Sequence, residues 1–182
     1  MWMQLEKAAD VLKAGGVIAY PTETVYGLGC DPDNAAAVQR ILSIKTRSVS
    51  KGLILLADSL ERLVRYTDIP ADKACELAKN WPVATTYLVP ASHACPHFIR
   101  GDHELVAVRV SPHPLVGELC QRLAKPLVST SANRRGEAPL TDASQVALHL
   151  GAEVDFIVTG QGTPDARPST IRNLITGEIV RP

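Results

Sequence analysis

Apolar and polar residues follow two different periods along the chain. Over residues 5–12 the apolar positions recur every three to four residues, which predicts an amphipathic helix that the glycines at 15 and 16 end. The unbroken apolar run at 17–20 is typical of a buried strand. Segment 21–29, which contains threonines and glycines, therefore predicts a loop at the carboxyl end of that strand.

The same two patterns alternate through most of the chain. The alternation predicts an α/β fold in which helices pack against a twisted, largely buried sheet. Segment 90–104 is the longest irregular stretch and predicts a surface flap. Further helices are predicted at 34–44, 59–65, 70–80, 114–123 and 142–150, and further strands at 52–57, 85–89, 106–110, 126–130, 156–158, 169–173 and 178–180.

Length and charge limit the classes of function. A chain of 182 residues with 46% hydrophobic content fits one domain, 1–182, with a sizeable core. Lys plus Arg (19) equal Asp plus Glu (19), so affinity for phosphate or nucleic acid must come from local clustering of charge. This balance argues against a histone-like or coating role.

The chain carries no pattern that indicates export or a membrane. Its first residues lack the basic and apolar regions of a signal peptide, and no apolar run approaches the ~18 residues of a membrane helix. The four cysteines are scattered without a Cys-x-x-Cys pair, which favours reduced thiols. We therefore expect a cytoplasmic protein without a membrane partner.

Three cations follow the helix predicted at 34–44. Lys45, Arg47 and Lys51 fall within seven residues that contain no acid, and an apolar strand comes next. Arginine offers a planar fork to phosphate oxygens and lysine a compact charge, so the set suits a nucleotide polyphosphate. The alternative is a solvated loop whose cations are favoured by the helix dipole.

Short polar residues follow the strand predicted at 126–130. Segment 129–133 reads Ser-Thr-Ser-Ala-Asn and can present hydroxyls and backbone amides to an anion, although a helix cap and turn would use the same residues. Ligands of open α/β sheets bind beyond the carboxyl ends of strands. We therefore expect this segment, the 45–51 loop and segment 21–29 to converge.

Together these segments resemble the YrdC/TsaC family, the threonylcarbamoyl-AMP synthases of tRNA modification. The resemblance covers nearly the whole chain and fits the short, single-domain members. It implies a twisted open mixed sheet with flanking helices and a concave basic cleft. The matching segments are 21–29, Lys45-x-Arg47 with Lys51, 106–110 with His113-Pro114, 129–133, 169–171 and 180–182.

The resemblance implies a reaction and its partners. L-threonine, bicarbonate and ATP give threonylcarbamoyl-adenylate and diphosphate, and other proteins then transfer the threonylcarbamoyl group to an adenosine beside the anticodon of tRNA. Mg²⁺ is expected on the phosphates, but no protein metal site stands out. The family pattern assigns ATP to Lys45, Arg47, Lys51, Ser131, Asn133 and Arg181, with Lys45 and Arg47 as the catalytic cations, and L-threonine to Thr24, Arg109, Ser129 and Ser169.

The chain departs from the family pattern at three places. Ser48 stands where proline is common, and segment 81–84 reads Trp-Pro-Val-Ala in place of Trp-Pro-Gly-Pro. We expect both changes to loosen backbone geometry, because Gly and Pro fix particular φ values. Leu56 stands where longer relatives often have a histidine, so one threonine contact is expected to be missing or supplied differently.

Other functions and roles stay open at this stage. The same basic cleft would serve a double-stranded RNA or tRNA-binding module without catalysis. A carbamoyl-transfer domain of hydrogenase maturation has a similar fold module, but its zinc-finger-like cysteines are absent here. Glu23 suits either an amine contact or a helix cap, and Tyr26 suits a pocket wall. The histidines at 93, 97 and 103 are assigned to the surface flap rather than to a metal.

Overall fold

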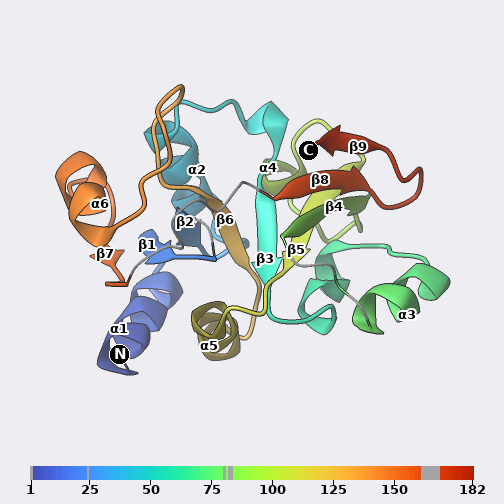
Figure 1. Cartoon of the computed structure of the whole chain (residues 1–182), viewed down its shortest axis with the longest axis horizontal. Coiled ribbons are helices and arrows are strands. Elements are labelled where there is room, and N and C mark those ends of the chain that lie inside the picture. Colours follow the sequence, from blue (N-terminus) through green and yellow to red (C-terminus); the bar gives the residue numbers. More distant parts are fainter. Residues whose placement is uncertain (1, 24, 80, 82–83, 161–168) are drawn as a thin grey trace.

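The strands form one mixed sheet in the order β7-β1-β2-β6-β3-β5-β4-β8-β9 (Figure 1). The computed structural model describes residues 2–23, 25–79, 81, 84–160 and 169–182. The strands are β1 Ile18–Pro21, β2 Tyr26–Cys30, β3 Ile54–Ala57, β4 Thr85–Pro90, β5 Leu105–Val110, β6 Leu127–Ser131, β7 Phe156–Ile157, β8 Thr170–Asn173 and β9 Ile179–Arg181. The helices are α1 Trp2–Lys13, α2 Ala35–Ile44, α3 Ala71–Lys79, α4 His97–Arg100, α5 Pro114–Leu123 and α6 Ala143–Leu150, with 3-10 turns η1 Val49–Lys51 and η2 Glu61–Tyr66.

Parallel and antiparallel neighbours are both present in this sheet. The pairs β1–β7, β3–β5 and β4–β8 are parallel, and the other neighbouring pairs are antiparallel. The predicted α/β class with a twisted mixed sheet and flanking helices is confirmed. Most predicted elements are present with small shifts at their ends, and the helix predicted at 59–65 is the 3-10 turn η2.

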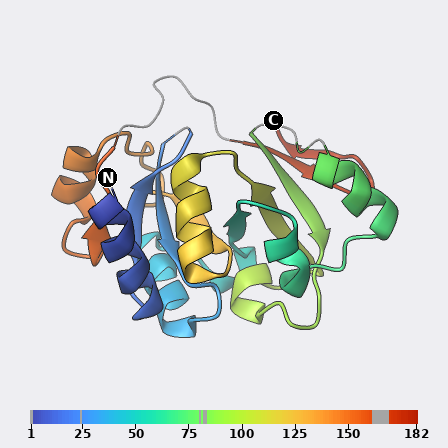
Figure 2. The same cartoon turned by 90° about the horizontal axis from the view of Figure 1, so that it is seen from below.

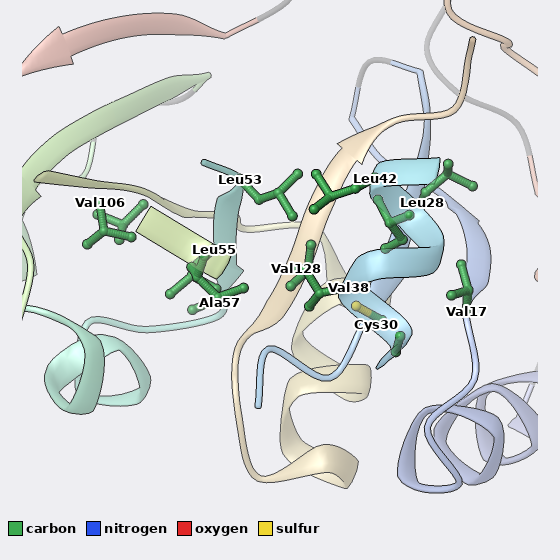
Figure 3. Close-up of a cluster of buried hydrophobic side chains, with 14 of the residues drawn as sticks. Val17, Leu28, Cys30, Val38, Leu42, Leu53, Leu55, Ala57, Val106 and Val128 are labelled. Atoms are coloured by element: carbon green, nitrogen blue, oxygen red, sulfur yellow. The ribbon is translucent and has the colours of Figure 1, made fainter. Parts of the chain in front are cut away.

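Helix α2 covers one face of the central strands. Val38 and Leu42 of α2 pack against Leu28 of β2 and Val128 of β6, and all four belong to one buried cluster (Figure 3). Leu55 of β3 extends the cluster toward β5. Strand residues alternate between the two faces, so the intervening positions must be buried by other helices.

Helices α1 and α5 lie side by side on the opposite face of the sheet (Figure 2). They bury Ile18 and Tyr20 of β1, Leu56 of β3 and Leu127 of β6 in a second cluster. Farther along the same strands this face carries polar residues instead. The two helices therefore cover only part of the face and leave room for a site.

The prediction of a loop through segment 21–29 was wrong for its second half, which forms strand β2. Tyr20 pairs with Gly27, and β2 lies between β1 and β6. A Cβ added at Gly29 would lie 2.7 Å from the Tyr20 ring and 3.1 Å from the carbonyl oxygen of Val128. Glycine is required because the tyrosine ring lies on the strand, and glycine is also what hid the strand from pattern reading.

The prediction of an irregular flap over 90–104 was wrong for residues 97–100, which form α4. Ile99 is fully buried, and its carbonyl oxygen accepts a hydrogen bond of 2.8 Å from the backbone N–H of Leu53. Gly101 follows with φ +70°, and a Cβ there would meet the carbonyl oxygen of Ser50 at 2.3 Å. The segment is thus packed under the loop that carries the predicted phosphate-binding cations.

Candidate active site

A cleft of about 1260 Å³ occupies the part of the sheet face that α1 and α5 leave open. The strand register explains which residues reach it: Ile54 pairs with Ser129 and with Ala107, and Leu56 pairs with Arg109. These side chains therefore share one face. Eight Lys and Arg residues but three acids line the cleft among the described residues, so the charge clustering expected in a neutral chain is present.

Lys45 ends helix α2 and crosses to the end of β6. Its ammonium group donates to the carbonyl oxygen of Ser131 at 2.7 Å and to Oδ1 of Asn133 at 2.8 Å. The side chain is buried, and burial, followed by the charge of Arg47, lowers the pKa of Lys45 to about 8. A lysine with a pKa of about 8 loses its charge at a lower pH than an ordinary lysine, and its pKa responds strongly to a bound anion.

A tight turn after α2 brings Arg47 into the cleft. Thr46 has φ +47°, and the backbone N–H of Arg47 bonds to the carbonyl oxygen of Leu42 at 2.9 Å, which closes the end of the helix. The Arg47 guanidinium donates to the carbonyl oxygen of Gly52 at 3.0 Å, and burial lowers the pKa of Arg47. Lys51 is exposed at the end of η1.

The loop keeps its geometry at one of the departures from the family pattern. Ser48 has φ −62°, within the range that proline fixes, and its Oγ accepts from the backbone N–H of Ser50 at 3.2 Å. The expected loosening is therefore not seen at this position. At the second departure Ala84 has φ +57°, a left-handed conformation that favours glycine, and Val83 lies outside the described residues.

The two polar residues of the segment after β6 are tied to each other. The hydroxyl of Ser131 donates to Oδ1 of Asn133 at 2.6 Å, and Nδ2 of Asn133 donates to the carbonyl oxygen of Glu137 at 2.7 Å. With Lys45 they form one hydrogen-bonded group at the edge of the cleft. The structure thus joins residues 86 or more positions apart that the sequence placed in separate loops.

Arg109 points into the cleft from the centre of the sheet, and its side chain is only 10% exposed. Its Nη2 lies 3.4 Å from Oε2 of Glu23. Within the described part of the chain, Nε and Nη2 of Arg109 and Oε2 of Glu23 are buried without a hydrogen-bond partner. Buried polar groups in proteins are nearly always paired, so this arrangement indicates a ligand site.

Three residues with hydroxyl groups, Ser129, Ser169 and Thr86, line the cleft along with Arg109. Ser129 accepts a hydrogen bond of 2.9 Å from the hydroxyl of Tyr20, which is fully buried and whose pKa is raised by that burial. The Ser169 and Thr86 hydroxyls bond to each other at 2.8 Å. Arg181 approaches from β9 and donates to the carbonyl oxygen of Ser169 at 2.7 Å.

Nine of the ten residues predicted for ATP or threonine line this single cleft, and Thr24 lies outside the described residues. Sequence reasoning missed Tyr20, Thr86 and Ser111, which contact predicted site residues or Glu23. Only Thr86 carried a signal, as a polar position inside an apolar strand. Tyr26 lines the cleft as expected, while its hydroxyl donates to the carbonyl oxygen of Gly160 at 2.7 Å.

Among the described residues, no group of three His, Cys, Asp or Glu side chains could hold a metal ion. No helix in that part of the chain is long and apolar enough to cross a membrane.

The sequence matches the Sua5/YciO/YrdC family, described as telomere recombination, over residues 10–182. The chain belongs to this family. A curated relative from Coxiella burnetii, named threonylcarbamoyl-AMP synthase, is 47% identical over 178 residues, which are 97% of this chain and 96% of that protein. A relative of the same name from Pseudomonas fluorescens is 46% identical over 180 residues, 98% of this chain and 97% of that protein.

Solved structures of family members have the same fold. Sua5 from P. abyssi in complex with L-threonine is 32% identical with a TM-score of 0.85, and the match covers 93% of this chain and 50% of Sua5. This chain therefore spans about half the length of Sua5. YciO from E. coli has a TM-score of 0.87 at 26% identity, covering 100% of this chain and 89% of YciO.

Proposed function

We propose that this chain is a threonylcarbamoyl-AMP synthase, which makes threonylcarbamoyl-adenylate and diphosphate from L-threonine, bicarbonate and ATP. The observation that carries the proposal is the buried guanidinium of Arg109, whose Nε and Nη2 lack a hydrogen-bond partner among the described residues, beside a cluster of cations in one cleft. A carboxylate would satisfy the first group and a polyphosphate the second. The names of the curated relatives and the Sua5 complex with threonine support the same assignment.

Two groups of residues in the cleft divide the substrates between them. Arg109 binds the threonine carboxylate, with Ser129 and Ser169, and Thr24 by family pattern, contacting the rest of the amino acid. Arg47 and Lys51 bind the phosphates with Lys45, and Ser131, Asn133 and Arg181 bind the nucleotide. Both sets line one continuous cleft, which supports an arrangement with the carbamate of threonine next to the α-phosphorus.

The chemistry on this proposal is nucleotidyl transfer without a covalent enzyme intermediate. The amine of threonine bonds to the carbon of bicarbonate and water leaves, which gives a carbamate. The carbamate oxygen then attacks the α-phosphorus of ATP and diphosphate leaves. Alignment of the carbamate with the α-phosphorus lowers the activation free energy by up to about 7–11 kcal/mol. Lys45 and Arg47 stabilise the negative charge on the leaving diphosphate. Mg²⁺ accompanies the phosphates. Asp102 and Glu104 are carboxylates on the cleft wall, but the metal would be held chiefly by the phosphates.

The product is passed to proteins that modify the adenosine beside the tRNA anticodon, which places the reaction in the cytoplasm. Four free cysteines, three of them buried, agree with a reducing compartment. A binder of double-stranded RNA is the competing function. Its phosphate contacts would need exposed cations, whereas Arg109 is buried beside an acid.

Product formation tests the proposal directly. Purified protein is incubated with labelled ATP, L-threonine, bicarbonate and Mg²⁺, and diphosphate and the acid-labile adenylate are measured. We expect both products to require threonine and bicarbonate. We also expect Arg109→Ala to raise the KM for threonine strongly, while Arg122→Ala, which removes a surface arginine paired with Glu118 on α5, leaves it unchanged. RNA binding without product would reject the synthase.

A further inference from the structure

We propose that Glu23 binds the α-ammonium group of the amino-acid substrate, so that Glu23 and Arg109 together select a zwitterion. The inference rests on the proposed function, because it concerns the amino-acid end of the same cleft. Arg109 and Glu23 form an ion pair that is close but poorly hydrogen-bonded. Nη2 of Arg109 and Oε2 of Glu23 are 3.4 Å apart, yet both atoms lack a hydrogen-bond partner among the described residues.

An arginine that serves only as a counter-ion for a carboxylate usually forms two parallel hydrogen bonds with it. Arg109 and Glu23 do not form two such bonds, so Nε and Nη2 of Arg109 and Oε2 of Glu23 stay available to a ligand. Leaving such groups unpaired in a buried site destabilises the fold, and does so more strongly when the groups are charged. The arrangement is therefore better explained as a site for a ligand than as a structural ion pair.

The other oxygen of Glu23 is fixed from behind. The hydroxyl of Ser111 donates to Oε1 of Glu23, and Ser111 Oγ accepts a hydrogen bond of 3.1 Å from the backbone N–H of His113. His113 is in turn the N-cap of α5. The carboxylate is thus held by the start of a helix through Oε1, and Oε2 is the oxygen left for a ligand.

The neighbouring pair defines the ligand chemistry. Arg109 offers N–H donors and Glu23 offers an acceptor with negative charge a few ångströms away. An α-amino acid carries a carboxylate and an ammonium group on one carbon, so it satisfies both side chains at once. A phosphate would meet repulsion from Glu23, whereas Lys45 and Arg47 in the same cleft would attract one.

Two fragments of threonine separate the ammonium contact from the carboxylate contact. One is 3-hydroxybutyrate, which lacks the amine, and the other is 1-amino-2-propanol, which lacks the carboxylate. Their binding constants are measured by competition against labelled L-threonine on the wild type and on Glu23→Gln. The substitution keeps the shape of the side chain and its acceptor for Ser111 but removes the charge.

We expect Glu23→Gln to weaken L-threonine and 1-amino-2-propanol by about tenfold to a hundredfold, the range for hydrogen bonds to charged groups. Binding of 3-hydroxybutyrate should stay within about twofold or tighten, because no ammonium contact is lost. Glu118→Gln, which removes a carboxylate paired with Arg122 on α5, serves as the matched control and should change none of the three constants.

The three binding constants distinguish an ammonium contact from an indirect effect. If Glu23→Gln weakens the binding of all three ligands equally, Glu23 only orients Arg109, and the inference is overturned while the proposed function stays intact. A wild-type protein that binds no threonine would overturn both. If Glu23→Gln does not fold, Ser111→Ala replaces it, and it should weaken threonine severalfold without affecting 3-hydroxybutyrate; equal effects on both ligands would again reject the ammonium contact.

Discussion

The hydroxyl of Tyr20 donates a hydrogen bond of 2.9 Å to Oγ of Ser129, which ties the packed half of the sheet face to its open half. Tyr20 is fully buried under α1 and α5, while Ser129 lines the cleft. The tyrosine thereby fixes the direction in which the serine hydroxyl points. Tyr20 cannot touch a ligand in the cleft, but it orients the hydroxyl of Ser129, a predicted threonine-binding residue.

Tyr20→Phe tests this relationship. The ring and its contact with Gly29 remain, so we expect the free energy of unfolding to fall by only about 1 kcal/mol, the worth of one neutral hydrogen bond. The KM for threonine should rise severalfold because Ser129 is no longer oriented, and the KM for ATP should not change. Steady-state kinetics with each substrate varied separately give the answer, and equal effects on both KM values would contradict it.

Gly29→Ala is expected to destabilise the fold. The new Cβ would lie 2.7 Å from the ring of Tyr20 and 3.1 Å from the carbonyl oxygen of Val128, and relieving such overpacking costs about 1–3 kcal/mol. Gly117→Ala in α5 is the control, because the new Cβ would lie 3.9 Å from Asp58 Cβ, an ordinary van der Waals contact, and should add up to about 1 kcal/mol of stability. Urea unfolding of both variants compares the two, and a stable Gly29→Ala would refute the steric argument.

Lys51→Ala and Arg47→Ala should differ in their effect on stability. Lys51 is exposed, so its loss should raise the KM for ATP without changing the melting temperature. Arg47 also bonds to the carbonyl oxygen of Gly52, so its loss should raise the KM and lower the unfolding free energy by about 1 kcal/mol. Thermal unfolding alongside ATP titration separates the effects; identical melting temperatures would show that the Arg47 bond contributes nothing to the fold.

ATP affinity is expected to fall as pH rises above about 8. Burial lowers the pKa of Lys45 from its ordinary 10.5 to about 8, and a phosphate beside the ammonium group would raise that pKa again. Binding then takes up a proton, so the affinity should decrease by up to about tenfold per pH unit above 8. Lys45→Met should bind more weakly but without this slope, and calorimetry from pH 7.5 to 9.5 measures both; equal slopes would exclude Lys45 as the titrating group.

The sequence by itself determined most of the elements and the candidate phosphate-binding cations. Helical and strand periods located α2, α5 and β5 closely because each buries a regular apolar face. The cluster of Lys45, Arg47 and Lys51 was readable for a similar reason, since three cations without an acid are unusual over so short a stretch. Family resemblance then supplied the expected substrates.

Only the tertiary structure decided the partners of these residues. The sequence pattern did not predict strand β2, because the ring of Tyr20 requires glycine on this strand. This contact is between two strands, so it leaves no periodic pattern in the sequence. The bonds from Lys45 to Ser131 and Asn133, and the approach of Glu23 to Arg109, join positions more than 80 residues apart. Local pattern reports burial and turn chemistry, whereas pairing across the sheet depends on register. Register, together with the packing of α2 and of the loop after β1, brought these charges into one cleft.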